Sequence, residues 1–165
     1  MILTFIAALA ASAPIPAVVA TLPPVIVSPA ERDLPVIMLQ RGAVNLSPQE
    51  AVMKAAEAAP DVVPGVFEFT VRRAERAGSN LFVGSEKDYR DQRCLSLRLS
   101  PIASAKLRER LGMDPAKALM GHRLLVVGAA QRVRIDFIEN GRPSGKYYYQ
   151  TQVPVVTADQ IDVLN

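Results

Sequence analysis

The sequence predicts a mainly β domain, built as a small closed barrel of five strands with one helix between the third and fourth strands. Two observations predict this class. From residue 66 onward, apolar side chains repeatedly alternate with polar ones, which is the period of half-buried strands. The longest helical pattern of this region, residues 101–111, follows the third alternating segment and precedes the fourth. A barrel suits a domain of this length because closure removes exposed strand edges.

The first twenty residues have the pattern of an export signal. Residues 2–20 are apolar or small and uncharged, and their densest part, 2–11, is too short to span a bilayer. Small residues suited to cleavage end at Ala20. We expect a signal peptide over 1–20, a periplasmic or secreted location, and no stable membrane span after cleavage. The alternatives are an uncleaved anchor that uses residues 2–27, or a misassigned start.

A tether and a short helix are expected before the barrel. Prolines interrupt residues 21–46, which favours an extended Pro-rich tether over a helix. Ser47 can then cap a helix, Pro48 suits its first position, and Glu50 can complete a capping box. Pro60 ends this pattern, so the leading helix is predicted over residues 47–59.

The barrel is expected over residues 66–165. Its first strand alternates from Phe67 to Val71, its second covers residues 81–83, and its third covers 93–99 with the leucines facing inward. The helix over residues 101–111 should turn Ile102, Ala105 and Leu111 to the core and end at Gly112.

The last two strands are longer. Apolar residues of 124–128 share one parity, and those of 133–137 continue the inward face with the other parity. This change predicts a bend or bulge near residues 128–131. A loop over 140–145 then precedes the fifth strand, residues 147–156. Three strands, a helix and two strands give the order of the OB-fold, a five-stranded Greek-key barrel. Another small α+β or β-roll domain is the alternative.

Several short segments resemble the bacterial OB-fold domains of the nucleic-acid-binding-like type. These segments are residues 81–85, 88–91, 119–128 and 160–163. The third looks like a "leucine, any residue, glycine, lysine" opening of the fourth strand, with His122 where lysine is commoner. These motifs are structural, so the resemblance implies an OB-fold, and it implies little about function.

The residue inventory argues against catalysis and metal binding. The chain has one cysteine, Cys94, and one histidine, His122, which excludes an internal disulfide and a four-ligand Cys/His zinc site. It has no nucleophile elbow and no phosphate-binding glycine loop. The carboxylates of Glu86, Asp88 and Asp91 alternate with cations, so we expect a solvated turn there. We predict no enzyme, no metal and no cofactor.

A basic barrel face is the strongest functional indication. Residues 66–146 hold sixteen Lys/Arg and nine Asp/Glu, a net charge of +7. With the leucines of the third strand inward, Ser96 and Arg98 should point out, as should Arg132 and Arg134 on the fourth strand. The candidate ligand-binding residues are Phe82, Tyr89, Arg90, Arg93, Arg98, Arg132, Arg134, Arg142, Lys146 and Tyr148.

These observations predict a non-enzymatic, exported binding module of the cell envelope, whose partner is an envelope protein or an anionic ligand. The alternative is a protein that binds single-stranded nucleic acid, because phosphates meet Arg and Lys while bases stack on aromatic rings.

Overall fold

The computed structural model describes residues 45–164. The expected signal peptide and most of the expected tether lie outside the described residues. Asn45 and Leu46, the end of that tether, form a short strand in the structure. None of the helices between residues 45 and 164 is long and apolar enough to cross a membrane.

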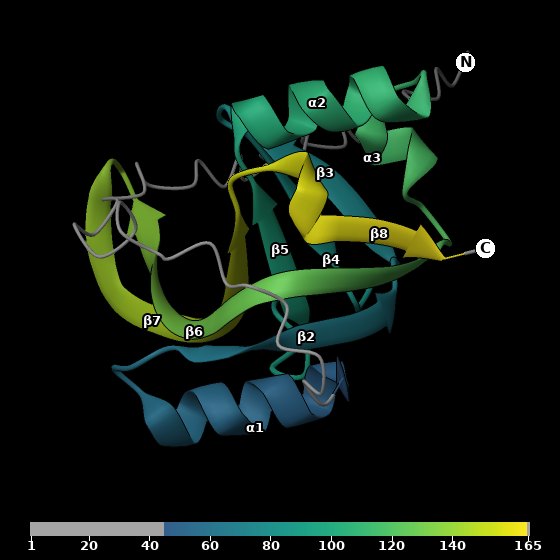
Figure 1. Cartoon of the computed structure of the whole chain (residues 1–165). Helices are drawn as coiled ribbons and strands as arrows, with labels where there is room; N and C mark the ends of the chain where they lie inside the picture. The colour runs from purple at the N-terminus through teal and green to yellow at the C-terminus, as the bar shows by residue number, and fades with distance from the viewer. Residues whose placement is uncertain (1–44, 165) are drawn as a thin grey trace, which may run out of the picture.

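The described chain is mainly β, which confirms the predicted class. In chain order the elements are β1 (Asn45–Leu46), α1 (Pro48–Ala58), β2 (Val63–Thr70), β3 (Arg73–Ala77), β4 (Asn80–Gly84), β5 (Leu95–Leu99), α2 (Pro101–Leu111), α3 (Pro115–Ala118), β6 (Arg123–Glu139), β7 (Arg142–Val155), the 3-10 turn η2 (Ala158–Gln160) and β8 (Ile161–Leu164). Figure 1 shows α1 below β2, and α2 with α3 on the opposite side of the strands.

The strands form one mixed sheet in the order β1-β2-β6-β7-β5-β4-β3, and β8 also pairs with β6. The pairs β1–β2 and β5–β7 are parallel, and the others are antiparallel. The sequence did not predict β3, because its five residues are mostly polar and small and lack an apolar alternation. The element order around α2 otherwise follows the predicted one.

The short link between β2 and β3 contacts two other strands at once. The amide of Val71 donates to the carbonyl of His122, just before β6. One residue later, the amide of Arg72 donates to the carbonyl of Gly84, at the end of β4. The chain therefore passes from pairing with β6 to pairing with β4 within two residues.

β6 changes partners along its length without a register shift at the predicted place. Residues up to Ala130 pair with β2, and residues from Gln131 onward pair with β7. Of the bend or bulge predicted near 128–131, the bulge is wrong, because the register shifts only between Asp136 and Ile138. The strand does change its partner there, from β2 to β7. The face of β6 that carries Leu124 and Val126 therefore continues through the even-numbered residues, which include Arg132 and Arg134.

Gly128 lies against Val153 of β7, just before the residues where β6 and β7 pair. A Cβ atom on Gly128 would lie 2.6 Å from a methyl carbon of Val153. Next to it, the amide of Gln160 donates to the carbonyls of Val127, at 3.0 Å, and Pro154, at 3.4 Å. Its side-chain oxygen accepts from the backbone amide of Val156 at 2.8 Å. A residue without a side chain thus allows the close approach, and Gln160 bridges the two strands there.

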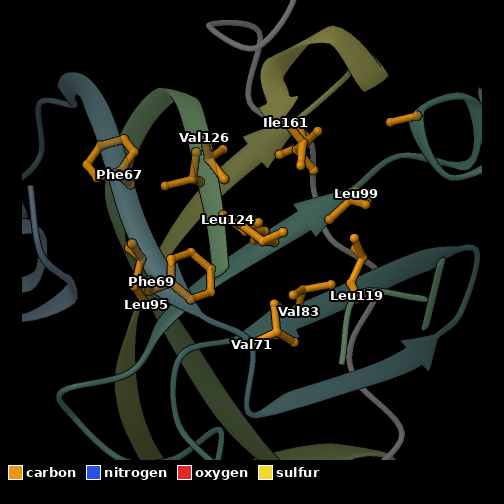
Figure 2. Close-up of a cluster of buried hydrophobic side chains, with 14 of the residues drawn as sticks. Phe67, Phe69, Val71, Val83, Leu95, Leu99, Leu119, Leu124, Val126 and Ile161 are labelled. Atoms are coloured by element: carbon orange, nitrogen blue, oxygen red, sulfur yellow. The ribbon is translucent and has the colours of Figure 1, made fainter. Parts of the chain in front are cut away.

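The core lies between the inward faces of the strands and is closed by α2 and α3. Figure 2 shows side chains from β2, β5, β6, β8 and the segment after α3 meeting in this cluster. The leucines of β5 are fully buried, as predicted. The predicted inward face of α2 is wrong for Ile102, which is 70% exposed, and for Ala105, and it is confirmed for Leu111, which packs against the core. The buried residues are Ala103, Ser104 and Leu107, because these and residue 111 share one stripe of the helix and residues 102 and 105 lie outside it.

Candidate ligand-binding arm

The β6–β7 hairpin extends beyond the rest of the sheet. The pairing of β2 with β6 ends at Ala130, and the pairing of β5 with β7 begins at Thr151. We call residues 131–150 the arm. In Figure 1 it bends away from α1 and β8 at the left of the view. The arm is a two-stranded ribbon, and its two faces carry different side chains.

One face of the arm is a row of arginines and tyrosines. The guanidinium carbon of Arg132 lies 3.9 Å from the ring centre of Tyr149, and that of Arg134 lies 4.1 Å from the ring centre of Tyr147. The two rings meet edge to face, with centres 5.6 Å apart. Tyr147 is 49% exposed and Tyr149 is 41% exposed. We call these four residues the stacked face.

The opposite face of the arm is fixed to the loop between β4 and β5. Tyr148 packs its ring against Phe137, with centres 5.4 Å apart, and against Tyr89, with centres 6.3 Å apart. Arg73 lies over the ring of Tyr89 at 4.3 Å. Burial raises the pKa of Tyr148 to about 12. We call these four residues the anchor cluster.

Gln150 adds hydrogen bonds to this anchor. Its amide nitrogen donates to the carbonyl of Tyr89 at 3.3 Å and to the hydroxyl of Tyr148 at 3.0 Å. Its oxygen accepts from the amide of Gln152 at 2.9 Å. The loop and the arm are therefore joined by aromatic packing and by hydrogen bonds, which hold the stacked face turned away from the loop.

Most of the cations among the predicted ligand-binding residues form an ion pair with a carboxylate of the same chain. Arg90 pairs with Asp88, Arg93 with Asp91, Arg134 with Asp136 and Lys146 with Glu139. Hydrogen bonds from the side chain and amide of Arg93 lower the pKa of Asp91 to about 2. Within residues 45–164, no carboxylate forms an ion pair with Arg132 or Arg142. The basic face is thus much less positive than the sequence predicts.

The predicted exposure of β5 is wrong. Ser96 is 5% exposed and Arg98 is 9% exposed, so neither contributes to an open surface. Burial lowers the pKa of Arg98. Phe82, which pairs with Arg98 across β4 and β5, is half-buried.

The structure divides the ten predicted residues among three places. Phe82 and Arg98 lie on β4 and β5, and Tyr89, Arg90 and Arg93 lie in the loop that follows β4. The other five lie on the arm: Arg132, Arg134, Arg142, Lys146 and Tyr148.

Sequence reasoning missed Tyr147 and Tyr149 as site residues. Along β7 they share the parity of Val153 and Val155, which are fully buried. The signal that could have identified them is the row of alternate arginines on β6, which pair with this parity of β7. Arg134 is the direct cross-strand partner of Tyr149.

Other parts of the described chain offer less. A shallow pocket of about 500 Å³ is lined by Arg110, Leu111, Met113, His122 and Asp162, among others. The guanidinium of Arg110 donates to the carbonyls of Ala158 and Ile161, so it serves structure. Between residues 45 and 164, no group of three or more His, Cys, Asp or Glu side chains is placed to hold a metal ion.

Comparisons with known proteins give little. No protein-family model matches the chain, and no curated protein matches it. Among solved structures, it is similar to a protein from Leishmania major Friedlin inferred to be an aspartyl-tRNA synthetase. The two are 10% identical with a TM-score of 0.38, over 78% of this chain and 22% of that protein. This chain therefore matches about a fifth of that protein's length.

Proposed function

We propose that this protein is a non-enzymatic binding module with an OB-type barrel, and that its ligand binds on the stacked face of the arm. For the barrel, the support is strand order. β2 and β3 are separated by two residues and pair with β6 and β4, so they can serve as one divided first strand. The order from β3 through β4, β5, β7 and β6 then returns to β2.

The stacked face is the observation that carries the binding proposal. An exposed tyrosine offers an apolar ring with a polar hydroxyl at its tip. The guanidinium over each ring adds positive charge on the same face of the arm. Each such pair contributes about 0.5–1 kcal/mol at an exposed site, so the four side chains are held in place before a ligand arrives. Arg132 has no carboxylate partner in the described chain and is the cation open to an anionic ligand.

Export belongs to the same proposal. The apolar leader over residues 1–20 supports a location in the cell envelope, where an envelope protein or another anionic ligand would be the partner. The mass of the mature N-terminus tests this: cleavage near Ala20 is expected, and an intact Met1 in a soluble cytoplasmic fraction would refute export.

Single-stranded nucleic acid is the second candidate ligand, and the exposed rings favour it specifically. Bases stack on aromatic side chains whatever the nucleic-acid sequence, and the phosphates bind to cations nearby. If Arg132 and Arg142 each neutralise one phosphate, the affinity should fall with a log–log salt slope of about −1.4. If all seven predicted cations took part, the slope would be about −5.

A salt titration with a labelled oligothymidylate tests the arm as an anion site. We expect binding at low salt, the shallow slope, and clear weakening by Arg132→Gln. Lys117→Gln, an exposed cation on α3, is the matched control and should change nothing. Polyphosphate, an anion without rings, separates the two candidates: if it competes as well as the oligonucleotide, an envelope anion is favoured. If neither probe binds at low salt, the binding proposal is wrong.

A further inference from the structure

The outer edge of the arm is without a partner in the described part of the chain. β2 pairs with one edge of β6 only as far as Ala130, whose partner in β2 is Val63. From Gln131 to Glu139, β6 pairs on its other side with β7, and no strand among residues 45–164 pairs with this edge. An open edge presents a row of backbone donors and acceptors, which is a template for another strand.

The side chains along this edge are complementary to themselves. In an antiparallel pair of two β6 edges centred on Ile135, Arg134 of each copy lies opposite Asp136 of the other. The same register places Val133 opposite Phe137. Opposite charges and apolar pairs that face each other across strands stabilise a sheet, and like charges destabilise it.

Neighbouring registers lack this match. A pair centred on Val133 would place Arg132 opposite Arg134, and a pair centred on Arg134 would place that arginine opposite itself. The register of β6 with β7 shifts between Asp136 and Ile138, so Phe137 lies at the end of the regular segment that this pair uses. The pattern of charges therefore selects the register centred on Ile135.

We propose that a second copy of this chain adds its β6 edge to the first in this register, joining the two arms into a four-stranded sheet. A twofold axis perpendicular to the sheet then places both stacked faces on the same side. The partly exposed Val133, Ile135 and Phe137 of the two copies form one apolar row on the other side. This pairing also supports the arm, because an isolated two-stranded hairpin has little stability of its own. The inference does not depend on the ligand.

Complementary charge variants of the full chain test it. Asp136→Arg gives a chain with two cations at positions 134 and 136, and Arg134→Asp gives a chain with two carboxylates there. We expect the unchanged protein to reach twice the mass of its 17.8 kDa chain in sedimentation equilibrium as concentration rises. Each variant alone should raise the dimer dissociation constant at least about tenfold, because like charges face each other. An equimolar mixture should restore dimers, since the cations of one variant then face the carboxylates of the other.

The mixture separates pairing between copies from the ion pair within each copy, which mixing cannot restore. Circular dichroism and thermal melting check that both variants fold. A wild-type protein that stays monomeric at all concentrations would overturn the proposal. So would single variants that dimerise as well as wild type, or a mixture that remains monomeric. As a second measurement, Ile135→Cys should form disulfide-linked dimers, and Leu125→Cys, which is paired on both sides by β2 and β8, should not.

Discussion

Arg132 and Arg134 lie two residues apart on the same face of β6, and only Arg134 holds a carboxylate. The reason is local: Asp136 is the next residue on that face, and Arg134 donates to it at 2.7 Å and 3.0 Å. The same spacing of two pairs the arginines of the loop after β4 with their aspartates. Sequence alternation could predict that these arginines are exposed. The same alternation places Asp136 beside Arg134, but it does not describe the turns that pair the loop arginines with their aspartates.

Gly128 carries the first prediction at this scale. Gly128→Ala should destabilise the fold by about 1–3 kcal/mol, because the added Cβ would overlap Val153 and force the core strands apart. The free energy of unfolding, measured in urea, checks this.

The clash with Val153 also predicts a rescue. Val153→Ala removes the methyl groups that the new Cβ meets, so the double variant should be more stable than the sum of the two single changes predicts. Strict additivity would show that the close approach is not the reason for a glycine here.

Among the elements, the arm is the one whose path the sequence pattern does not predict. The apolar pattern of residues 133–137 predicts a return to the core after a bend or bulge at 128–131. The strand instead keeps its parity and passes from pairing with β2 to pairing with β7 alone. The apolar residues 133–137 then face the loop after β4, where Tyr89 and Tyr148 meet. That loop lies far away in the sequence, so no local pattern could reveal what these residues pack against.

The anchor cluster predicts an unusual tyrosine titration. Burial raises the pKa of Tyr148 to about 12, so an absorbance titration should show a step for this tyrosine at that high pH. In the unfolded chain this group titrates near its ordinary pKa of about 10, so the folded state binds more protons between these values. The stability from Tyr148 is therefore present below pH 10 and is lost as the pH rises through about 12.

Tyr148→Phe provides the check on this assignment. The variant should lack this step at high pH, and its stability should lose this part of the alkaline dependence. If the step persists in Tyr148→Phe, another tyrosine is the buried one, and the anchor cluster is placed wrongly.

Across the whole molecule, the order of the main elements was predictable and the separate strand β3 was not. Turn residues and apolar alternation marked the segments that became β4, β5, β6 and β7. β3 was not predicted because its side chains are mostly polar or small and its pairing with β4 is made by the backbone. The location of the candidate site was also predicted only in part, because burial depends on the tertiary structure. The sequence placed it partly on β5, where Arg98 proves to be buried, while the structure presents its exposed rings on the arm.

The most direct test of the arm as the ligand site is a map of amide chemical shifts in the isotope-labelled protein, recorded as oligothymidylate is added at low salt. Our account predicts that the largest changes fall within residues 131–150, centred on Arg132, Arg134, Tyr147 and Tyr149. Changes centred instead on Phe82 and the β4–β5 surface, with the arm unaffected, would contradict it.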